Sequence, residues 1–176
     1  ININKNRGVS YCRNIGIKKS TGEYIGFLDS DDQYLKGGIN IILHNIKKYN
    51  NKDLFVLSGK ENNENVIDRN QFLKESQSDN KKNILDCIKN FNQFRATCWN
   101  FIIKRNILSS NNIQFKNIKV FEDQAFVSDV LCLVNKYKII SKPIYAKNTA
   151  ETDSLSKKTG HIVAYSCAKT IYEISK

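Results

Sequence analysis

The sequence predicts an α/β fold, and three observations carry that prediction. Segments with strand character alternate with segments of helical periodicity along the first 60 residues. The strand candidates at 23–28 and 53–58 are continuously apolar at their centres, a pattern typical of strands buried on both faces of a mostly parallel sheet. A chain of 176 residues, 40% hydrophobic and 26% charged, is long enough for one domain with its own core.

The first half of the chain contains the clearest elements. Apolar residues recur at helical spacing after the Asn6-Arg7-Gly8 turn, and Ser20-Thr21-Gly22 ends that pattern. We expect a helix over 9–19, a strand over 23–28, a helix from Tyr34 or Gly38 to Tyr49, and a strand over 53–58. The second helix is the more amphipathic, because Ile39, Ile42, Leu43 and Ile46 form one stripe.

The second half is harder to assign. Residues 61–80 are polar and ambiguous, and 96–105 suits either a strand or a helix. Further elements are expected as a helix over 83–91, a helix over 124–135, a strand-like end to 137–146, and a closing helix over 164–175. Glu122 and Asp123 stand where carboxylates favour the start of a helix.

The composition limits the classes of partner. A formal net charge of +11 suits nucleic acid, an anionic membrane or an anionic substrate. The lysines are scattered and do not interleave with aromatic residues in a nucleic-acid motif, so a solvated basic surface is favoured and no nucleic-acid partner is expected. Five widely spaced cysteines indicate reduced thiols and predict a cytoplasmic protein. No apolar run reaches 18 residues, so no membrane span is predicted.

Three carboxylates, Asp29, Asp31 and Asp32, follow the strand at 23–28. Close carboxylates repel one another unless a cation or a functional demand holds them together. Ligands of α/β sheets bind beyond the carboxyl ends of strands, where such oxygens suit Mg²⁺ or Mn²⁺ with phosphate. A helix cap explains only one of the three, and an EF-hand lacks the glycine and the glutamate that its loop requires.

Two separated blocks carry a family resemblance. The stretch 6–32, NRGVSYCRNIGIKKSTGEYIGFLDSDD, resembles glycosyltransferase family 2, the inverting nucleotide-sugar transferases of GT-A fold. A second, ordered match is made of Trp99-Asn100, Lys104-Arg105-Asn106, Ile113-Gln114-Phe115 and 121–126, FEDQAF. The resemblance covers about residues 6–156.

The resemblance implies a Rossmann-like, GT-A nucleotide-diphospho-sugar transferase domain over 1–176. Its nucleotide and metal part is expected at 1–60, its acceptor part at 61–160 and a C-terminal helix at 161–176. The family's early strands, with their Asp-Asp-Gly-Ser turn, have no counterpart in this sequence. We therefore expect a partial domain that lacks its first strands and, as given, binds donor poorly.

The resemblance also assigns site residues. It implies donor and metal contacts at Asp29 and Asp31, with Asp32 as a third metal ligand and Mn²⁺ or Mg²⁺ as cofactor. The remaining assignments are Arg13 for the nucleotide, Asp123 as catalytic base, and Trp99 and Glu122 on the acceptor side. Without the resemblance, plainer roles stay open: Arg13 on a helix surface, Trp99 in the core, and Glu122 and Asp123 as an N-terminal cap.

The implied function is transfer of a sugar from a nucleoside diphosphate, expected to be UDP, to a hydroxyl of a glycan or lipid-linked acceptor. Inversion and a role in surface polysaccharide synthesis belong to the same expectation. A basic surface also suits peripheral association with the inner face of the plasma membrane. The alternatives are a catalytically inactive fragment and a basic module that binds polyanions.

Overall fold

The computed structural model describes residues 2–61, 65–67, 97–147 and 169. The helices and strands are α1 Val9–Lys19, β1 Tyr24–Gly26, β2 Gln33–Tyr34, α2 Gly38–Lys48, β3 Leu54–Glu61, β4 Asn65–Ile67, the 3-10 turn η1 Cys98–Asn100, β5 Phe101–Lys104, α5 Arg105–Ser110, α6 Glu122–Leu133 and β6 Tyr137–Lys147. The helix expected over 83–91 and most of 161–176 lie outside the described residues. Lys169 alone of that last segment is described, and it is helical.

The described strands form one sheet in the order β1-β5-β3-β6-β2, with β4 also paired to β3. The expectation of a mostly parallel sheet is wrong for this part of the chain. Only β3 and β6 run parallel, whereas the other four described pairs are antiparallel. The apolar runs indicate that both faces of a strand are buried. An antiparallel sheet that is covered on both faces has the same sequence pattern, so the runs do not indicate strand direction.

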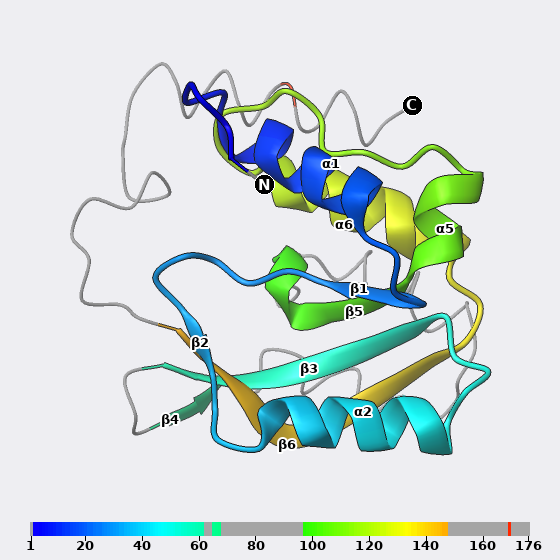
Figure 1. Cartoon of the computed structure of the whole chain (residues 1–176). Helices are drawn as coiled ribbons and strands as arrows, with labels where there is room; N and C mark the ends of the chain where they lie inside the picture. The colour runs from blue at the N-terminus through cyan, green and yellow to red at the C-terminus, as the bar shows by residue number, and fades with distance from the viewer. Residues whose placement is uncertain (1, 62–64, 68–96, 148–168, 170–176) are drawn as a thin grey trace.

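Helices cover both faces of the sheet (Figure 1). The side chains of β3 alternate between them: Leu54 and Val56 join the core beneath α5 and α6, while Phe55 and Leu57 join the core against α2. All four are almost fully buried. This two-sided burial fixes the register of the central strand, because a one-residue slip would exchange the two cores.

The predicted helix boundaries agree best with the structure where the sequence has clear signals for the start and end of the helix. The helix over 9–19 matches α1, whose preceding Gly8 has φ +84°. The second helix begins at Gly38, so Tyr34 as its start is wrong; that tyrosine belongs to β2 instead. The described part of the segment expected over 96–105, residues 97–105, combines both expected types, since the 3-10 turn η1 leads directly into β5.

Gly38 shows why this helix starts where it does. A Cβ atom at this position would lie 2.9 Å from the backbone oxygen of Ile144 in β6. Glycine therefore lets the first turn of α2 pack directly on the backbone of β6. The segment between β1 and α2, which contains the three aspartates, is tied to the same strand by the pairing of β2 with β6.

Candidate active site

The three aspartates occupy the turn after β1, and the structure gives them different surroundings. Asp29 and Asp32 are partly buried, and Asp31 is exposed. The backbone N–H of Asp32 donates to the carbonyl oxygen of Asp29 over 3.1 Å, which closes the turn. The acidic turn, defined here as residues 29–32, thus presents the Asp31 carboxylate to solvent. The carboxylates of Asp29 and Asp32 contact other protein groups instead.

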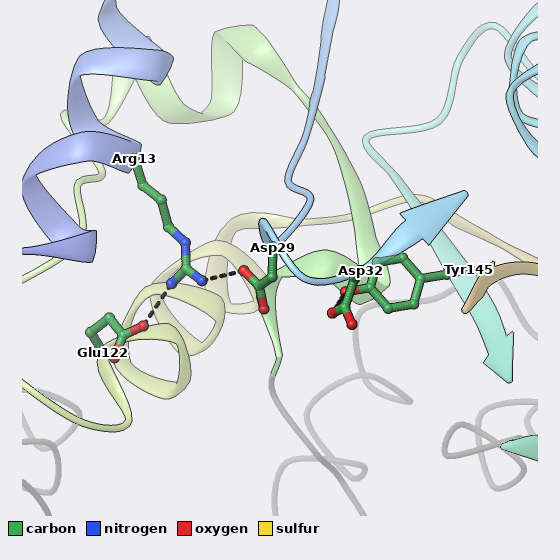
Figure 2. A network of polar contacts seen from close by, with 5 residues as sticks. All are labelled: Arg13, Asp29, Asp32, Glu122 and Tyr145. Carbon is green, nitrogen blue, oxygen red and sulfur yellow. Dashed lines mark hydrogen bonds and ion pairs between the residues drawn. The ribbon is translucent and has the colours of Figure 1, made fainter. Parts of the chain in front are cut away.

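Arg13 on α1 joins two carboxylates from distant parts of the chain (Figure 2). Its Nη2 lies 2.7 Å from Oδ1 of Asp29, and its Nη1 lies 2.6 Å from Oε1 of Glu122 at the start of α6. The side chains of Arg13 and Glu122 are only 14% and 11% exposed. Buried charges of this kind are costly unless paired. Arg13 therefore fixes the acidic turn and the beginning of α6 relative to each other.

A second contact from α1 fixes the segment that leads into α6. The side chain of Asn14 donates to the carbonyl oxygen of Phe115 over 2.9 Å and accepts from its backbone N–H over 2.8 Å. The Phe115 ring stacks on that of Phe126 in α6, with centroids 3.9 Å apart, and the Arg13 guanidinium lies 5.2 Å from the Phe115 ring centre. Neighbouring residues of one helix, Arg13 and Asn14, thus hold Glu122 and Phe115 at the two ends of the segment 115–122 that leads into α6.

Asp123 follows Glu122 in the first turn of α6 and is partly buried. Burial, with the adjacent Glu122 charge, raises the pKa of Asp123 to about 7, although Arg13 acts in the opposite direction. A helix N-terminus lowers the pKa of a nearby carboxylate, and desolvation outweighs that effect at Asp123. The residue before the pair, Phe121, has φ +66°, an uncommon conformation for a side chain of this size.

The plainer role at the helix start fits Asp123 in part, because its carboxylate accepts a hydrogen bond from its own backbone N–H. Phe121 is the N-cap residue of α6, and it makes no side-chain cap hydrogen bond. The Glu122 carboxylate bonds to Arg13. A carboxylate with a pKa near neutrality, placed beside a charged network, is a feature that accompanies catalytic acids and bases.

Trp99 lies in η1 and is 4% exposed. Its ring stacks on Tyr145 of β6, with centroids 4.1 Å apart and planes 5° from parallel. The Tyr145 hydroxyl donates in turn to the Asp32 carboxylate (Figure 2). Cys98, which precedes Trp99, is fully buried beside the charged network, and burial raises the pKa of its thiol strongly.

The structure thus joins Arg13, Asp29 and Glu122 in one network and places Asp123 beside it. Trp99 is connected to Asp32 through Tyr145. Sequence reasoning missed Tyr145 and the bridging geometry of Arg13. The run Ile144-Tyr145-Ala146 looks like any buried strand, and no local pattern marks a tyrosine whose partner lies 113 residues away. For Arg13, the long separation from Glu122 likewise leaves no spacing signal.

Residues 1–111 match the family model described as "Glycosyl transferase family 2". The chain belongs to this family. The match contains α1 and the acidic turn, and it ends before α6. Among the described residues, no helix combines the length and the apolar character needed to cross a bilayer.

Curated relatives extend the similarity beyond that match. The chain is 32% identical over 167 residues to the poly(ribitol-phosphate) beta-N-acetylglucosaminyltransferase TarP of Staphylococcus aureus. The matched region covers 90% of this chain and 49% of that protein. The chain is 28% identical over 162 residues to the minor teichoic acid biosynthesis protein GgaB of Bacillus subtilis, covering 88% of this chain and 17% of the relative. The chain therefore spans less than half the length of either protein.

Solved structures of S. aureus TarS share the fold. TarS 1-349 in complex with UDP-GlcNAc superposes with a TM-score of 0.68 at 21% identity, covering 87% of this chain and 42% of that one. The complex of TarS 1-349 with UDP superposes with a TM-score of 0.69 at 19% identity, covering 96% of this chain and 44% of that one. The fold of this chain is therefore GT-A, as the sequence predicted.

Proposed function

We propose that this chain transfers a sugar from a UDP-linked donor to a hydroxyl of a cell-surface glycan, with inversion at the anomeric carbon. The observation that carries the proposal is Asp123, a carboxylate with its pKa raised to about 7 next to the Arg13 network. Family membership and the TarS complexes with UDP and UDP-GlcNAc support a nucleotide-sugar donor. A general base is most effective when its pKa lies near the working pH.

The mechanism needs one base and one leaving group. The acceptor hydroxyl attacks the anomeric carbon, its proton passes to the Asp123 carboxylate, and the bond from that carbon to the UDP diphosphate breaks. A single displacement inverts the configuration and forms no covalent intermediate. Because the base must be deprotonated, we expect kcat/KM to rise with pH and to level off above about 7.

The acidic turn offers few free protein ligands to a divalent cation. The described residues contain no group of three His, Cys, Asp or Glu side chains placed to hold a metal. The Asp29 carboxylate forms an ion pair with Arg13, and the Asp32 carboxylate accepts a hydrogen bond from Tyr145. The Asp31 side chain is exposed. This set suits an ion that takes most of its ligands from diphosphate and water, as Mg²⁺ does. We propose Asp31 as the principal protein ligand, and the ion would offset the charge of the leaving diphosphate.

The acceptor follows from charge and from the relatives. TarP is named for a poly(ribitol-phosphate) acceptor and GgaB for teichoic acid synthesis. A net charge of +11 is complementary to such a polyanion. We propose a phosphate-containing surface glycan as acceptor. The alternative, a basic module that only binds polyanions, lacks any need for Asp123 or Asp31.

The test is titration calorimetry of UDP into the purified protein at its full natural length, with and without Mn²⁺, together with turnover of UDP-sugar, because the chain as given is expected to bind donor poorly. We expect D31N to weaken metal-dependent UDP binding, and D123N to keep that binding while losing turnover. A folded wild-type protein that binds no UDP would contradict the proposal. A protein that binds polyanions more tightly when Asp31 and Asp123 are neutralised would favour the binding module instead.

Peripheral membrane association is a second proposal, supported by α2. Its outer face exposes Ile39 and Leu43, which are 47% and 50% exposed, and Leu43 lies one turn before Lys47. Apolar side chains beside lysines suit an anionic bilayer surface. We expect L43S to reduce pelleting with vesicles that contain anionic lipid. Equal pelleting with neutral and anionic vesicles would refute the association.

A further inference from the structure

Tyr145 is a buried tyrosine with a charged partner. The residue is fully buried in β6, and its hydroxyl donates to the Asp32 carboxylate. The hydroxyl is the donor of this hydrogen bond, because an ionised carboxylate only accepts. A hydrogen bond from a neutral donor to a carboxylate is among the stronger ones in proteins.

The ring of Tyr145 is fixed from several sides. One face stacks on Trp99, and Tyr34 of β2 packs edge-on with its centroid 6.3 Å away. Gly59 of β3 leaves room for this stack, because a Cβ there would lie 3.2 Å from the Tyr145 backbone oxygen and 3.3 Å from the Trp99 ring. A side chain packed in this way has one orientation, so the position of its hydroxyl is set by the core.

The partner of that hydroxyl belongs to the acidic turn. Asp32 adjoins Asp31, and its backbone N–H closes the turn onto Asp29. The turn is therefore held at two points. Arg13 holds its first residue from the α1 side, and Tyr145 holds its last residue from the sheet. Between these two attachments stands Asp31, the exposed carboxylate.

We propose that Tyr145 is a positioning residue for donor binding: stacked on Trp99, it holds Asp32 and so orients Asp31 toward the diphosphate. This inference rests on the proposed nucleotide-sugar donor. It also changes the role of Trp99. With one ring face covered by Tyr145 and 4% of the residue exposed, Trp99 acts through the tyrosine and does not offer its face to the acceptor.

The decisive variant is Y145F, which removes one hydroxyl and keeps the stack. We expect it to raise the Kd for UDP and the KM for donor about ten-fold, which corresponds to about 1.4 kcal/mol, and to change kcat less than two-fold. The matched control is Y34F, which removes a hydroxyl from the edge-on neighbour in the same aromatic group. Its UDP affinity should stay within two-fold of wild type. Equal UDP affinities for Y145F and wild type would overturn the inference.

A double-mutant cycle isolates the contact itself. Y145F, D32A and the double variant should show coupling in UDP affinity, because the second change removes an interaction that the first has already broken. Strictly additive effects would overturn the role of the hydroxyl. If wild type binds UDP and only the coupling fails, the proposed function survives. If wild type binds no UDP, the proposed function fails and this role fails with it.

Trp99 provides a readout that needs no turnover. It is the single tryptophan of the 176-residue sequence, so the tryptophan emission of the protein reports the stack directly. We expect UDP with Mn²⁺ to change this emission in wild type and in Y34F. In Y145F, saturating UDP should leave the emission nearly unchanged, because the ring is no longer tied to the turn. An unaltered response in Y145F would contradict the coupling.

Discussion

The substitution D123N should stabilise the protein while it abolishes turnover. Burial of the Asp123 carboxylate penalises its charged form, so the folded state prefers the protonated acid. Asparagine carries no charge at any pH and has nearly the same shape. Removing the charge should therefore relieve a cost that the native protein bears above neutral pH.

The magnitude follows from the shift in pKa. The pKa of Asp123 rises from its ordinary value of 3.8 to about 7. One pKa unit corresponds to about 1.4 kcal/mol, so the full shift is worth about 4 kcal/mol. The sign is that of a raised carboxyl pKa: the penalty is absent below about pH 4, grows as pH rises toward 7, and is complete above that. For a domain of this size, about 4 kcal/mol of relief corresponds to a Tm increase of roughly 8–16 °C.

The assay is thermal unfolding of wild type and D123N at pH 5 and pH 8. We expect the difference in Tm between the two proteins to be larger at pH 8 than at pH 5. D31N is the matched control, because Asp31 is an exposed carboxylate of the same site. A D123N protein whose Tm advantage is the same at both pH values, or is matched by D31N, would refute the argument that burial raises this pKa.

Three further substitutions test how the site is held. R13M leaves two carboxylates facing each other without their cation, so urea unfolding should show a loss of about 2–4 kcal/mol; a loss under 1 kcal/mol would mean that water replaces the guanidinium. N14A removes both hydrogen bonds to Phe115, and we expect a loss of about 1–3 kcal/mol in the same assay; an unchanged midpoint would show that this loop is held elsewhere. G38A places a Cβ 2.9 Å from the backbone oxygen of Ile144 and should lower stability by about 1–3 kcal/mol; a more stable variant would show that α2 can shift off β6.

Local patterns determined much of this protein. The helix of α1 was bounded correctly because a turn precedes it and Ser20-Thr21-Gly22 ends it, signals that act within a few residues. The acidic turn was recognisable because three carboxylates after an apolar strand conflict with simple burial. The ordered blocks from Asn6 to Asp32 and from Trp99 to Phe126 identified the family, and the family model and the shared GT-A fold confirm that identification.

Strand direction was decided only by the tertiary structure. A continuously apolar strand indicates that both of its faces are covered. It does not indicate whether the neighbouring strands are parallel or antiparallel to it. The sequence therefore predicted a mostly parallel sheet, whereas β5 lies between β1 and β3 and runs antiparallel to both.

The site assignments show the same division. The residue types of the network were predictable, and their pairing was not, because Arg13 lies 109 residues from Glu122 and Tyr145 lies 113 residues from Asp32. The raised pKa of Asp123 likewise depends on how much water the folded chain removes from one carboxylate. Sequence spacing encodes contacts within a helix or a turn; contacts across the sheet and the degree of desolvation exist only once the chain has packed.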